Sequence, residues 1–501
     1  MGNSRSVPAE EDDDARLQSA LAKLEKAAFY SNLKDLRNGF SGVILTPDLR
    51  EPYTVARHRP YNQDSRGYPL VIARPTTTAD VSRVIKFVRE HGDGIALCVE
   101  GGGHSHKCME DDAIVLDLEL MNATEVNVDE QTIVVGGGAY LEAVDKALEP
   151  HRLVVPVGTY PLTGVGGLTL AGGFGWTSRF LGTTCDNFIE AEVVLSDGRV
   201  VKANDSNEFS DLMKGLRGGG GNFGVVTSFM FRAHKLPTHC YCGKTVFIAP
   251  TRASKLEILQ NYDALVQTLP HNTTSALVFS GGAPVVPIIW AHYGEEATLD
   301  DVKSLKSVKS LGGLFTYENS IRKRSHYSDV QNMTREFAKS GHIYTSFNMI
   351  GSTDKPLPIA CFENMVDFTS QALPSTMLNA ECLFFQANSG KYTPSIPSSM
   401  DPASRESRYY SIVEAKWKPE SGSKGKEDAR NWCKAVIEIL RKYDAFAIHA
   451  PDAVNSTVVN ESGTAQMLSK EGATAAQLRA LKTKYDPDNF FRMNSNILPL
   501  A

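Results

Sequence analysis

The sequence predicts an α+β protein made of two large units. With 501 residues the chain is longer than one hydrophobic core usually serves. The first half alternates short apolar strands and helices with glycine-rich loops. Glycine density falls near Leu236 and Pro237, where longer mixed elements begin. This second half is typical of an antiparallel sheet with helices on one face. We therefore expect a ligand-binding unit followed by a sheet unit that takes the substrate.

Apolar periodicity and turn residues set the predicted elements of the first unit. In chain order these are a surface helix at 12–29, extended pieces at 41–44 and 53–55, a strand at 70–75, a helix at 78–91, strands at 94–99, 113–117 and 132–136, a helix at 141–148, strands at 185–194 and 199–201, a helix at 208–216 and a strand ending at 231. Thr78 can cap the helix that it begins. Ser196, Asp197 and Gly198 predict a hairpin turn between the two strands beside them.

The second unit is expected to mix helices and strands of ordinary length. Helices are predicted at 252–269, 299–307, 358–372 and 427–443, and strands at 244–248, 275–279, 286–292, 343–350, 380–386 and 409–417. A further helix at 474–484, which Thr474 could cap, precedes the tail. The strand at 409–417 alternates, so Tyr410, Ile412, Glu414 and Lys416 share one face.

Composition excludes two classes of protein. The formal net charge of −6 argues against binding to a nucleic-acid backbone as the main task. No apolar run approaches the ~18 residues that would suggest a membrane span. The longest candidate, 283–291, is short and broken by proline. We therefore expect neither nucleic acid among the partners nor a membrane span.

The N-terminal segment is expected to be a disordered leader, because it lacks the apolar core of a secretory signal. Gly2 and Ser6 match the N-myristoylation pattern, but the acidic run at 10–14 would be repelled by anionic lipid. The eight cysteines are scattered, so we expect reduced thiols in a cytoplasmic compartment. Cys240 and Cys242 lack a second pair to complete a zinc set, so no metal is expected.

The most informative stretch is 156–175, in which seven of twenty residues are glycine. Two more glycine-dense loops bracket it, at 100–105 and 217–224. Each of these two lies beside a predicted strand, and the first follows the C-terminal end of its strand, where α/β folds place ligands. Backbone with few side chains can lie directly against a flat or charged ligand. Three such loops predict one long ligand that the chain contacts at several points.

Common nucleotide motifs do not account for these loops. The run from Gly164 to Thr169 lacks the third glycine of the dinucleotide fingerprint, and no Gly-Lys-Ser/Thr completes a Walker loop. An RNA-binding interpretation of 217–224 has only one copy of its repeat, in an acidic protein. His104 stands beside bare backbone and can contact a planar ring. The alternatives are a histidine satisfied by the backbone, or a metal ligand together with His106.

Taken together, these segments resemble the berberine bridge enzyme-like branch of the vanillyl-alcohol-oxidase-type flavoproteins. The resemblance rests on GGGHS at 101–105, GVGGLTLAGGFGW at 164–176, CDN at 185–187, SDGRVV at 196–201, LRGGGGNFGVVTSF at 216–229 and YDPDNFFRMNSNILP at 485–499. It implies a PCMH-type FAD-binding domain of two α+β subdomains and an antiparallel-sheet substrate domain. The expected division is a leader and N-terminal helix at 1–37, the FAD-binding domain at 38–237, the substrate-binding domain at 238–450, and a C-terminal segment at 451–501 that returns to the FAD domain.

The resemblance assigns FAD as the cofactor. In the family the first glycine loop carries a histidine bonded to the C8-methyl group of FAD, and His104 matches it. Many members add a bond through cysteine, but the matching residue here is Tyr160, so one covalent link is expected. The expected FAD contacts come from the glycine loops, a following strand and the tail: Gly101, Gly102, Gly103, His104, Ser105, Tyr160, Thr163, Gly164, Gly166, Gly167, Leu168, Thr169, Gly172, Gly173, Val226 and Asn494.

Family enzymes place catalytic side chains on the strand that matches 409–417. Glu414 or Tyr410 is therefore a candidate base, and Lys416 could tune it. The alternative is that Glu414 and Lys416 form a solvated strand face. Family members often carry a tyrosine base where this chain has Ala453. Substrate and mechanism are therefore expected to differ from those of the sugar oxidases.

The reaction that the resemblance implies is an oxidation with O2 as the electron acceptor. A C–H bond next to a hydroxyl group or a nitrogen of a small molecule, expected to be a secondary metabolite, would lose hydride to the flavin. Thr163 lies near the position that controls oxygen access in the family, and it is smaller than a blocking leucine. One rival is a flavin-containing biosynthetic cyclase without net redox turnover. Another is a binding protein without enzymatic activity.

Overall fold

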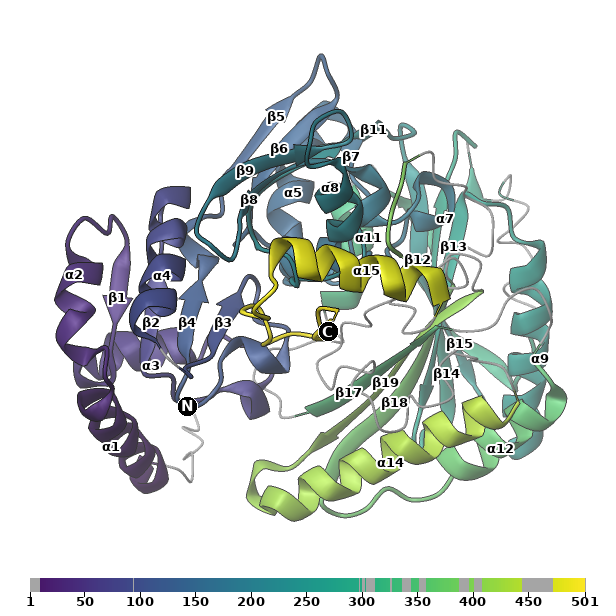
Figure 1. Ribbon diagram of the computed structural model, residues 1–501. Coiled ribbons are helices and arrows are strands. Elements are labelled where there is room, and N and C mark those ends of the chain that lie inside the picture. Colours follow the sequence, from purple (N-terminus) through teal and green to yellow (C-terminus); the bar gives the residue numbers. More distant parts are fainter. Residues whose placement is uncertain are drawn as a thin grey trace, which may run out of the picture.

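The computed structural model describes residues 10–92, 94–296, 298–299, 302, 311–324, 327–335, 344–350, 357–386, 396–400, 408–443 and 472–500. Its main sheets have four, five and eight strands, and helices pack on each of them. The fold is therefore α+β, as the sequence predicts. Figure 1 shows the four-stranded sheet at one end of the molecule, the eight-stranded sheet at the other and the five-stranded sheet between them.

The four-stranded sheet lies near the N-terminus and has the order β1-β2-β4-β3. Its strands are β1 (Val43–Leu45), β2 (Val71–Arg74), β3 (Leu97–Glu100) and β4 (Ile114–Asp117), and β2, β4 and β3 run parallel. Helix α4 (Thr78–His91) joins β2 to β3 and buries its apolar face against the sheet. The helices α1 (Glu10–Lys26), α2 (Leu33–Arg37) and α3 (Glu51–Arg57) complete this layer.

The five-stranded sheet is antiparallel and has the order β5-β6-β10-β8-β9. Its strands are β5 (Thr124–Asn127), β6 (Thr132–Gly136), β8 (Phe188–Val194), β9 (Val200–Asn204) and β10 (Val225–Arg232). The helices of this region are α5 (Leu141–Leu148), α6 (Val165–Leu170), α7 (Ser178–Leu181) and α8 (Ser210–Leu216). The short strands β7 (Leu153–Val154) and β11 (His234–Lys235) pair beside it. The predicted hairpin between β8 and β9 is confirmed.

The eight-stranded sheet is antiparallel and belongs to the second half of the chain. Its order is β15-β12-β14-β13-β18-β19-β17, with β16 also paired to β12. The strands are β12 (Cys240–Ile248), β13 (Thr273–Ser280), β14 (Val285–Tyr293), β15 (Phe315–Asn319), β16 (Arg322–Arg324), β17 (Tyr344–Ile350), β18 (Met377–Gln386) and β19 (Tyr409–Trp417). Helices α9 (Arg252–Thr268), α12 (Ile359–Thr369) and α14 (Gly422–Lys442) cover one face of this sheet.

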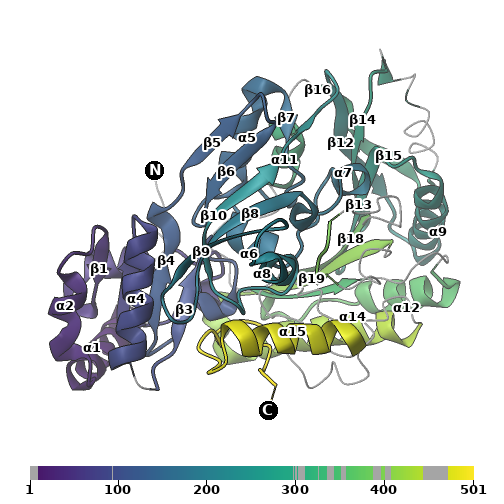
Figure 2. The ribbon, with the colours of Figure 1, turned by 45° about the horizontal axis from the view of Figure 1, so that its top comes forward.

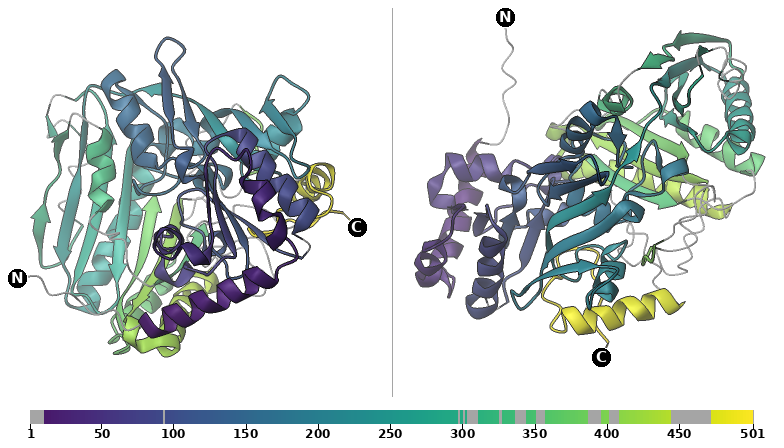
Figure 3. Two further views of the ribbon diagram at one scale, coloured as in Figure 1. Left: turned by 90° about the vertical axis from the view of Figure 1, so that its left-hand side faces the viewer. Right: turned by 90° about the horizontal axis from the view of Figure 1, so that it is seen from above.

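The other face of the eight-stranded sheet packs against the five-stranded region. Ala276, Ile289 and Phe385 of this face share a buried core with Phe229 and Phe231 of β10. Helix α11 (Tyr327–Arg335) joins the same core. The last helix, α15 (Gly472–Tyr485), returns to the first half and lies beside α8 (Figure 2). Figure 3 shows from above that the N-terminal helices and α9 lie at opposite ends of the molecule.

Two predictions near the N-terminus are wrong. The helix predicted at 12–29 is confirmed as α1 (Glu10–Lys26), so the acidic run at 10–14 belongs to this helix and not to a disordered leader. The Asp13 carboxylate accepts hydrogen bonds from Arg57 and Tyr68. The segment 53–55 is helical and not extended. It belongs to α3, whose first turn contains Pro52. Proline fits there because its missing N–H would have no partner in the helix.

Several predicted boundaries also shift. Thr77, not Thr78, caps α4, and its hydroxyl accepts from the N–H of Asp80 in a capping box. Residues 185–187 form a 3-10 turn (Thr184–Asn187) before β8. Thr474 lies inside α15 rather than at its cap. Almost all of the predicted helix at 299–307, the first residue of the predicted strand at 343–350, Ala453 and residues 1–9 lie outside the described residues.

The described residues contain neither a disulfide bond nor a membrane-spanning helix. All eight cysteines are buried and none forms a disulfide. Within the described ranges, no helix has both the length and the apolar character needed to cross a membrane.

Candidate functional site

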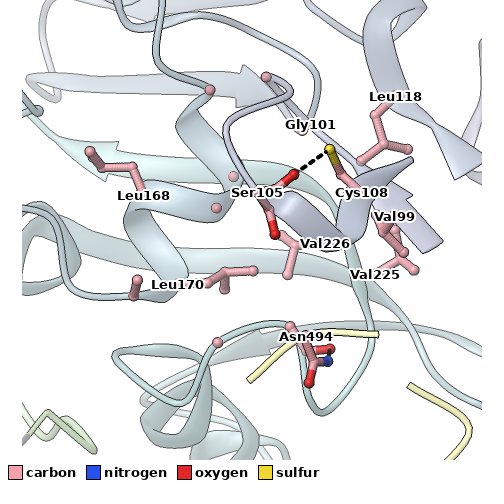
Figure 4. A pocket seen from close by; sticks show the side chains of 18 of the residues that line it. Val99, Gly101, Ser105, Cys108, Leu118, Leu168, Leu170, Val225, Val226 and Asn494 are labelled. Carbon is pink, nitrogen blue, oxygen red and sulfur yellow. Dashed lines mark hydrogen bonds between the residues drawn. The ribbon is translucent and has the colours of Figure 1, made fainter. Parts of the chain in front are cut away.

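Three glycine loops that are far apart in the sequence meet at one pocket. The first follows β3, the second leads into α6 and the third joins α8 to β10. The first two are in direct backbone contact, because a Cβ added to Gly102 would lie 2.3 Å from the backbone nitrogen of Gly164. The pocket lining contains residues of all three loops and of the tail after α15. In Figure 4, Leu168 and Leu170 of α6, Val226 of β10 and Asn494 of the tail lie around it.

The pocket is lined by main chain and apolar side chains. None of the described lining residues is Asp, Glu, Lys or Arg. A Cβ added to Gly167 or Gly221 would meet nothing within 4 Å, so at these positions only a hydrogen atom separates the backbone from open space. A ligand with negative charge would therefore be bound by backbone N–H groups rather than by cationic side chains.

Two buried polar atoms of the tail lack a hydrogen-bond partner among the described residues. The Asn494 side chain donates to the carbonyl oxygens of Gly221 (3.0 Å) and Phe491 (3.1 Å). Its Oδ1 atom and the Ser495 hydroxyl are buried without a hydrogen-bond partner among the described residues. Both residues line the pocket. Because buried polar atoms are normally hydrogen-bonded, these two are suited to hydroxyl or amide groups of a ligand.

His104 lies at one end of the pocket in an aromatic environment. The Tyr61 ring stacks on its imidazole with 4.8 Å between centroids, and the Tyr160 ring meets it edge-on at 5.9 Å. The His104 Nε2 atom lies 3.1 Å from the carbonyl oxygen of Leu162. Burial lowers the pKa of His104 to about 4, so the ring is neutral at pH 7. A carbonyl oxygen only accepts, which puts the ring proton on Nε2 and leaves a lone pair on Nδ1.

A buried ionic cluster supports the first glycine loop. Arg59 donates to the carbonyl oxygen of Gly101 (2.8 Å), and its guanidinium pairs with Asp117 and with Glu100 (3.4 Å). Arg74 pairs with the second oxygen of Asp117 at 2.7 Å. The side chains of Glu100 and Asp117 are fully buried. Charge-assisted hydrogen bonds from this cluster therefore hold the backbone at Gly101, where the loop begins.

Lys482 and Asn222 fasten the tail to the third glycine loop. The fully buried Lys482 ammonium donates to the carbonyl oxygens of Asn222 and Phe491 (both 3.0 Å) and pairs with Asp486 at 2.6 Å. The Asn222 side chain donates to Ser495 O at 3.2 Å and accepts from Ile497 N at 2.9 Å. This network holds the tail, with its pocket-lining residues, against the loop.

A second group of polar side chains lies on the eight-stranded sheet, on the face that packs toward the pocket unit. The Tyr410 ring contacts Phe174, which follows α6, with 5.6 Å between centroids. On the same face of β19 the Lys416 ammonium lies 3.0 Å from Glu414. Lys416 is almost buried and interacts electrostatically with Tyr160, the neighbour of His104. Glu414 and Lys416 thus lie at an interface between units and do not form a solvated face.

Glu381 belongs to this group, and the sequence analysis missed it. It lies on β18 directly opposite Glu414 in the antiparallel register. Burial and the charge of Glu414 raise the pKa of Glu381 to about 7. A lone acidic residue in a mostly apolar strand was a usable signal. The sequence alone does not predict that β18 pairs with β19, and this pairing is what places Glu381 opposite Glu414.

Most predicted cofactor residues gather at the pocket. Twelve line it: Gly101, Gly102, Gly103, His104, Ser105, Thr163, Gly164, Gly166, Gly167, Leu168, Val226 and Asn494. Tyr160 instead contacts His104. Thr169 is buried, and its hydroxyl has no hydrogen-bond partner among the described residues. Gly172 and Gly173 are not among the lining residues, and a Cβ added to Gly173 would meet Thr184.

Comparison with known proteins agrees with this arrangement. Residues 69–204 match the family described as FAD binding domain, and residues 472–498 match the family described as Berberine and berberine like. An FAD-linked oxidoreductase of Dictyostelium discoideum is 27% identical over 476 residues, which cover 95% of this chain and 99% of that protein. The chain therefore carries the FAD-binding and berberine-like domains of an FAD-linked oxidoreductase, and it is similar to the berberine bridge enzyme-like proteins.

Relatives of this FAD-linked oxidoreductase include named oxidases. Chitooligosaccharide oxidase of Gibberella zeae is 27% identical, covering 86% of this chain and 88% of that protein. (R)-6-hydroxynicotine oxidase of Paenarthrobacter nicotinovorans is also 27% identical, covering 86% and 91%. The matched FAD-binding domain supports FAD as the cofactor, and these two named relatives are oxidases of small molecules.

Solved structures share the fold of this FAD-linked oxidoreductase. 6-Hydroxy-D-nicotine oxidase from Arthrobacter nicotinovorans superposes with a TM-score of 0.78 at 22% identity, covering 92% of this chain and 98% of that one. Glucooligosaccharide oxidase from Acremonium strictum, described with 6-S-cysteinyl, 8α-N1-histidyl FAD, has a TM-score of 0.74 at 19% identity, covering 97% and 100%.

Proposed function

We propose that this FAD-linked oxidoreductase holds FAD in the glycine-lined pocket, bonded to His104, and oxidises a small molecule with O2 as the electron acceptor. One observation carries the proposal. Three glycine loops and the tail converge on an uncharged pocket that ends at a neutral imidazole with a lone pair on Nδ1.

The pocket fits FAD by its chemistry. Backbone N–H groups of Gly101 to Gly103 and Gly164 to Gly167 suit a pyrophosphate. Leu168 and Val226 offer apolar surface to flat rings. The unpartnered oxygens of Asn494 and Ser495 suit polar groups of the cofactor. Ser105 also lines the pocket, close to His104.

A single covalent link follows from the residues beside His104. The histidyl FAD of the glucooligosaccharide oxidase supports Nδ1 of His104 as the bonding atom, because Nε2 is committed to Leu162. That enzyme also has a cysteinyl bond, whereas Tyr160 offers no thiol near His104. We therefore propose attachment through His104 alone.

FAD, when bound, supplies the acceptor for hydride and the site of reaction with O2. The chain's own residues bind and orient both partners. Thr163 lines the pocket with a small side chain, which supports access for O2. Tyr410, Glu414 and Lys416 form the polar wall of the opposing sheet, where a substrate hydroxyl or amine group would give up its proton. The named relatives act on an oligosaccharide and on an amine, so a C–H next to oxygen or nitrogen is the proposed reacting bond.

The test is anaerobic mixing of the purified yellow protein with a panel of chitooligosaccharides, 6-hydroxynicotine, alkaloids and phenolic polyketides. We expect one class to bleach the flavin, and air to restore its colour with release of hydrogen peroxide. A coloured protein that converts a substrate without bleaching would instead support a biosynthetic cyclase. A protein without visible absorbance would contradict the proposal.

We also propose a division of labour along the chain. Residues 38–237 form the FAD-binding domain, 238–450 the substrate-binding domain and 451–501 a segment that returns to the FAD domain. The contacts of Lys482 and Asn222 support this role for the C-terminal segment.

A further inference from the structure

Two glutamates face each other across neighbouring strands of the eight-stranded sheet. Glu381 of β18 and Glu414 of β19 are direct partners in the antiparallel register. Side chains of such partners begin only about 4.5–5.5 Å apart at their Cβ atoms. Both lie on the face that carries Tyr410, whose ring contacts Phe174 of the pocket unit. The pair therefore points toward the side of the molecule that holds the pocket.

Lys416 forms an ion pair with Glu414 but not with Glu381 among the described residues. The Lys416 ammonium lies 3.0 Å from Glu414. The ion pairs between described residues include no cation in contact with Glu381. Ser280 of β13 pairs with Glu381 on its other side and carries no charge. Three further titratable groups interact electrostatically with these residues: Cys382 with Glu381, Cys433 with Glu414 and Tyr160 with Lys416. Lys416 is in contact with Glu414, whereas Glu381 is largely buried beside a second carboxylate, so the charged form of Glu381 is disfavoured.

We propose that Glu381 is the proton acceptor of the reaction, with Glu414 and Lys416 as positioning residues. The inference rests on the proposed oxidase function. The O–H or N–H bond of the substrate breaks, its electron pair stays on the oxygen or nitrogen, and the proton forms the carboxylic acid of Glu381. The acid then loses this proton to solvent before the next turnover. Glu381 is partly exposed, and it lies on the sheet face that packs toward the pocket unit.

The environment suits this role better for Glu381 than for Glu414. A base acts most efficiently when its pKa lies near the working pH. Burial, reinforced by the negative charge of Glu414, raises the pKa of Glu381 to about 7, against a partial opposing effect of Lys416. The Glu414 carboxylate is instead engaged by the Lys416 ammonium at 3.0 Å.

The first test needs no substrate. Infrared titration of the flavin-loaded protein follows the carbonyl band of protonated carboxyl groups. We expect a band that disappears with a midpoint near pH 7 in the wild type and is missing in Glu381→Gln. In Glu414→Gln the midpoint should fall, because the repulsion is removed, and in Lys416→Met it should rise. Glu318→Gln is the matched control, because Glu318 is an ion-paired glutamate of the same sheet, on β15. A band that persists in Glu381→Gln would overturn the proposal.

The second test uses the panel compound that bleaches the wild-type flavin. The rate of anaerobic bleaching should rise with pH through about 7 in the wild type. Glu381→Gln should lose this pH dependence and react roughly 10²–10⁴-fold more slowly, the usual share of a general base. Glu381→Asp should keep the pH dependence at a reduced rate, which separates chemistry from misfolding. If Glu381→Gln bleaches at the wild-type rate, the proton-acceptor role of Glu381 is contradicted but the oxidase function is not. No bleaching of the wild type by any compound contradicts the oxidase function and the proton-acceptor role together.

Discussion

His104 and Glu381 carry ordinary titratable groups whose surroundings disfavour the charged form. Burial lowers the pKa of His104 to about 4, whereas burial and Glu414 raise the pKa of Glu381 to about 7. The first shift keeps a lone pair on a nucleophilic nitrogen. The second places a proton acceptor in its useful range. Both roles follow from neighbours rather than from residue type.

The stacked ring of Tyr61 should assist attachment of the flavin to His104. Tyr61→Leu removes the stacking partner, so the imidazole loses part of its fixed orientation. An aromatic contact of this kind is worth about 0.5–1.5 kcal/mol, so we expect attachment to slow by up to about tenfold. Flavin fluorescence of the denatured polypeptide on a gel measures the attached fraction. Tyr61→Phe keeps the ring and should behave as the wild type. Equal attached fractions in all three proteins would refute the role.

Glu381 should make stability fall as pH rises. Its carboxyl group titrates near 4.5 in the unfolded chain and near 7 in the folded protein. The folded state therefore binds the proton more tightly, and this contribution is complete below pH 4.5 and lost as pH rises through about 7. Relative to Glu381→Gln, the wild type should lose up to about 3 kcal/mol across this window. Chemical denaturation at a series of pH values measures the difference. Parallel curves for the two proteins would contradict the raised pKa.

At the scale of elements, the tail after α15 lines the pocket, and a buried lysine of α15 holds it there. Lys482 reaches Asn222 and Phe491 and pairs with Asp486, so it fastens the tail to the third glycine loop. Its partner carbonyl lies 260 residues away in sequence. This distance explains why the sequence predicts the helix but not its function as an anchor.

Lys482→Met should therefore destabilise the protein and weaken its hold on FAD. Removing one member of a buried pair leaves Asp486 charged without its partner, which costs about 3–5 kcal/mol. Thermal unfolding and flavin release on dilution are the measurements. Lys484→Met is the matched control, two residues along the same helix. Lys484 pairs with Asp211 in solvent, with half of its side chain exposed, and should cost less than about 1 kcal/mol. Similar losses in both variants would contradict the anchoring role.

Local patterns predict elements well where neighbours in sequence decide the structure. The hairpin at Ser196 to Gly198 and helix α4 follow from turn residues and apolar spacing. The segment 53–55 was misassigned because Pro52 suggests a break, whereas it begins a helix. Glycine content alone predicts that the three glycine-rich loops contact a ligand. Their mutual contact at Gly102 and Gly164 depends on the tertiary fold.

At the scale of the whole molecule, the site lies between two units that the sequence describes separately. The pocket belongs to the first unit, and the polar wall of β18 and β19 belongs to the second. Phe174 against Tyr410 and Tyr160 beside Lys416 join them. Alternation in one strand predicts that Glu414 and Lys416 share a face, and the family resemblance makes them candidates for catalysis. Glu381 could not be predicted as their partner, since strand order in a sheet is decided by long-range packing.

The central claim is that FAD is bonded to His104 in this pocket, and one measurement tests it most directly. Mass spectrometry of the peptide that contains residue 104, after proteolysis of the acid-precipitated protein, should show the added mass of the flavin cofactor on His104. The same peptide from His104→Ala should carry no addition, although that protein should still bind FAD without a covalent bond. An unmodified His104 peptide from a wild-type protein purified with its flavin would contradict the account.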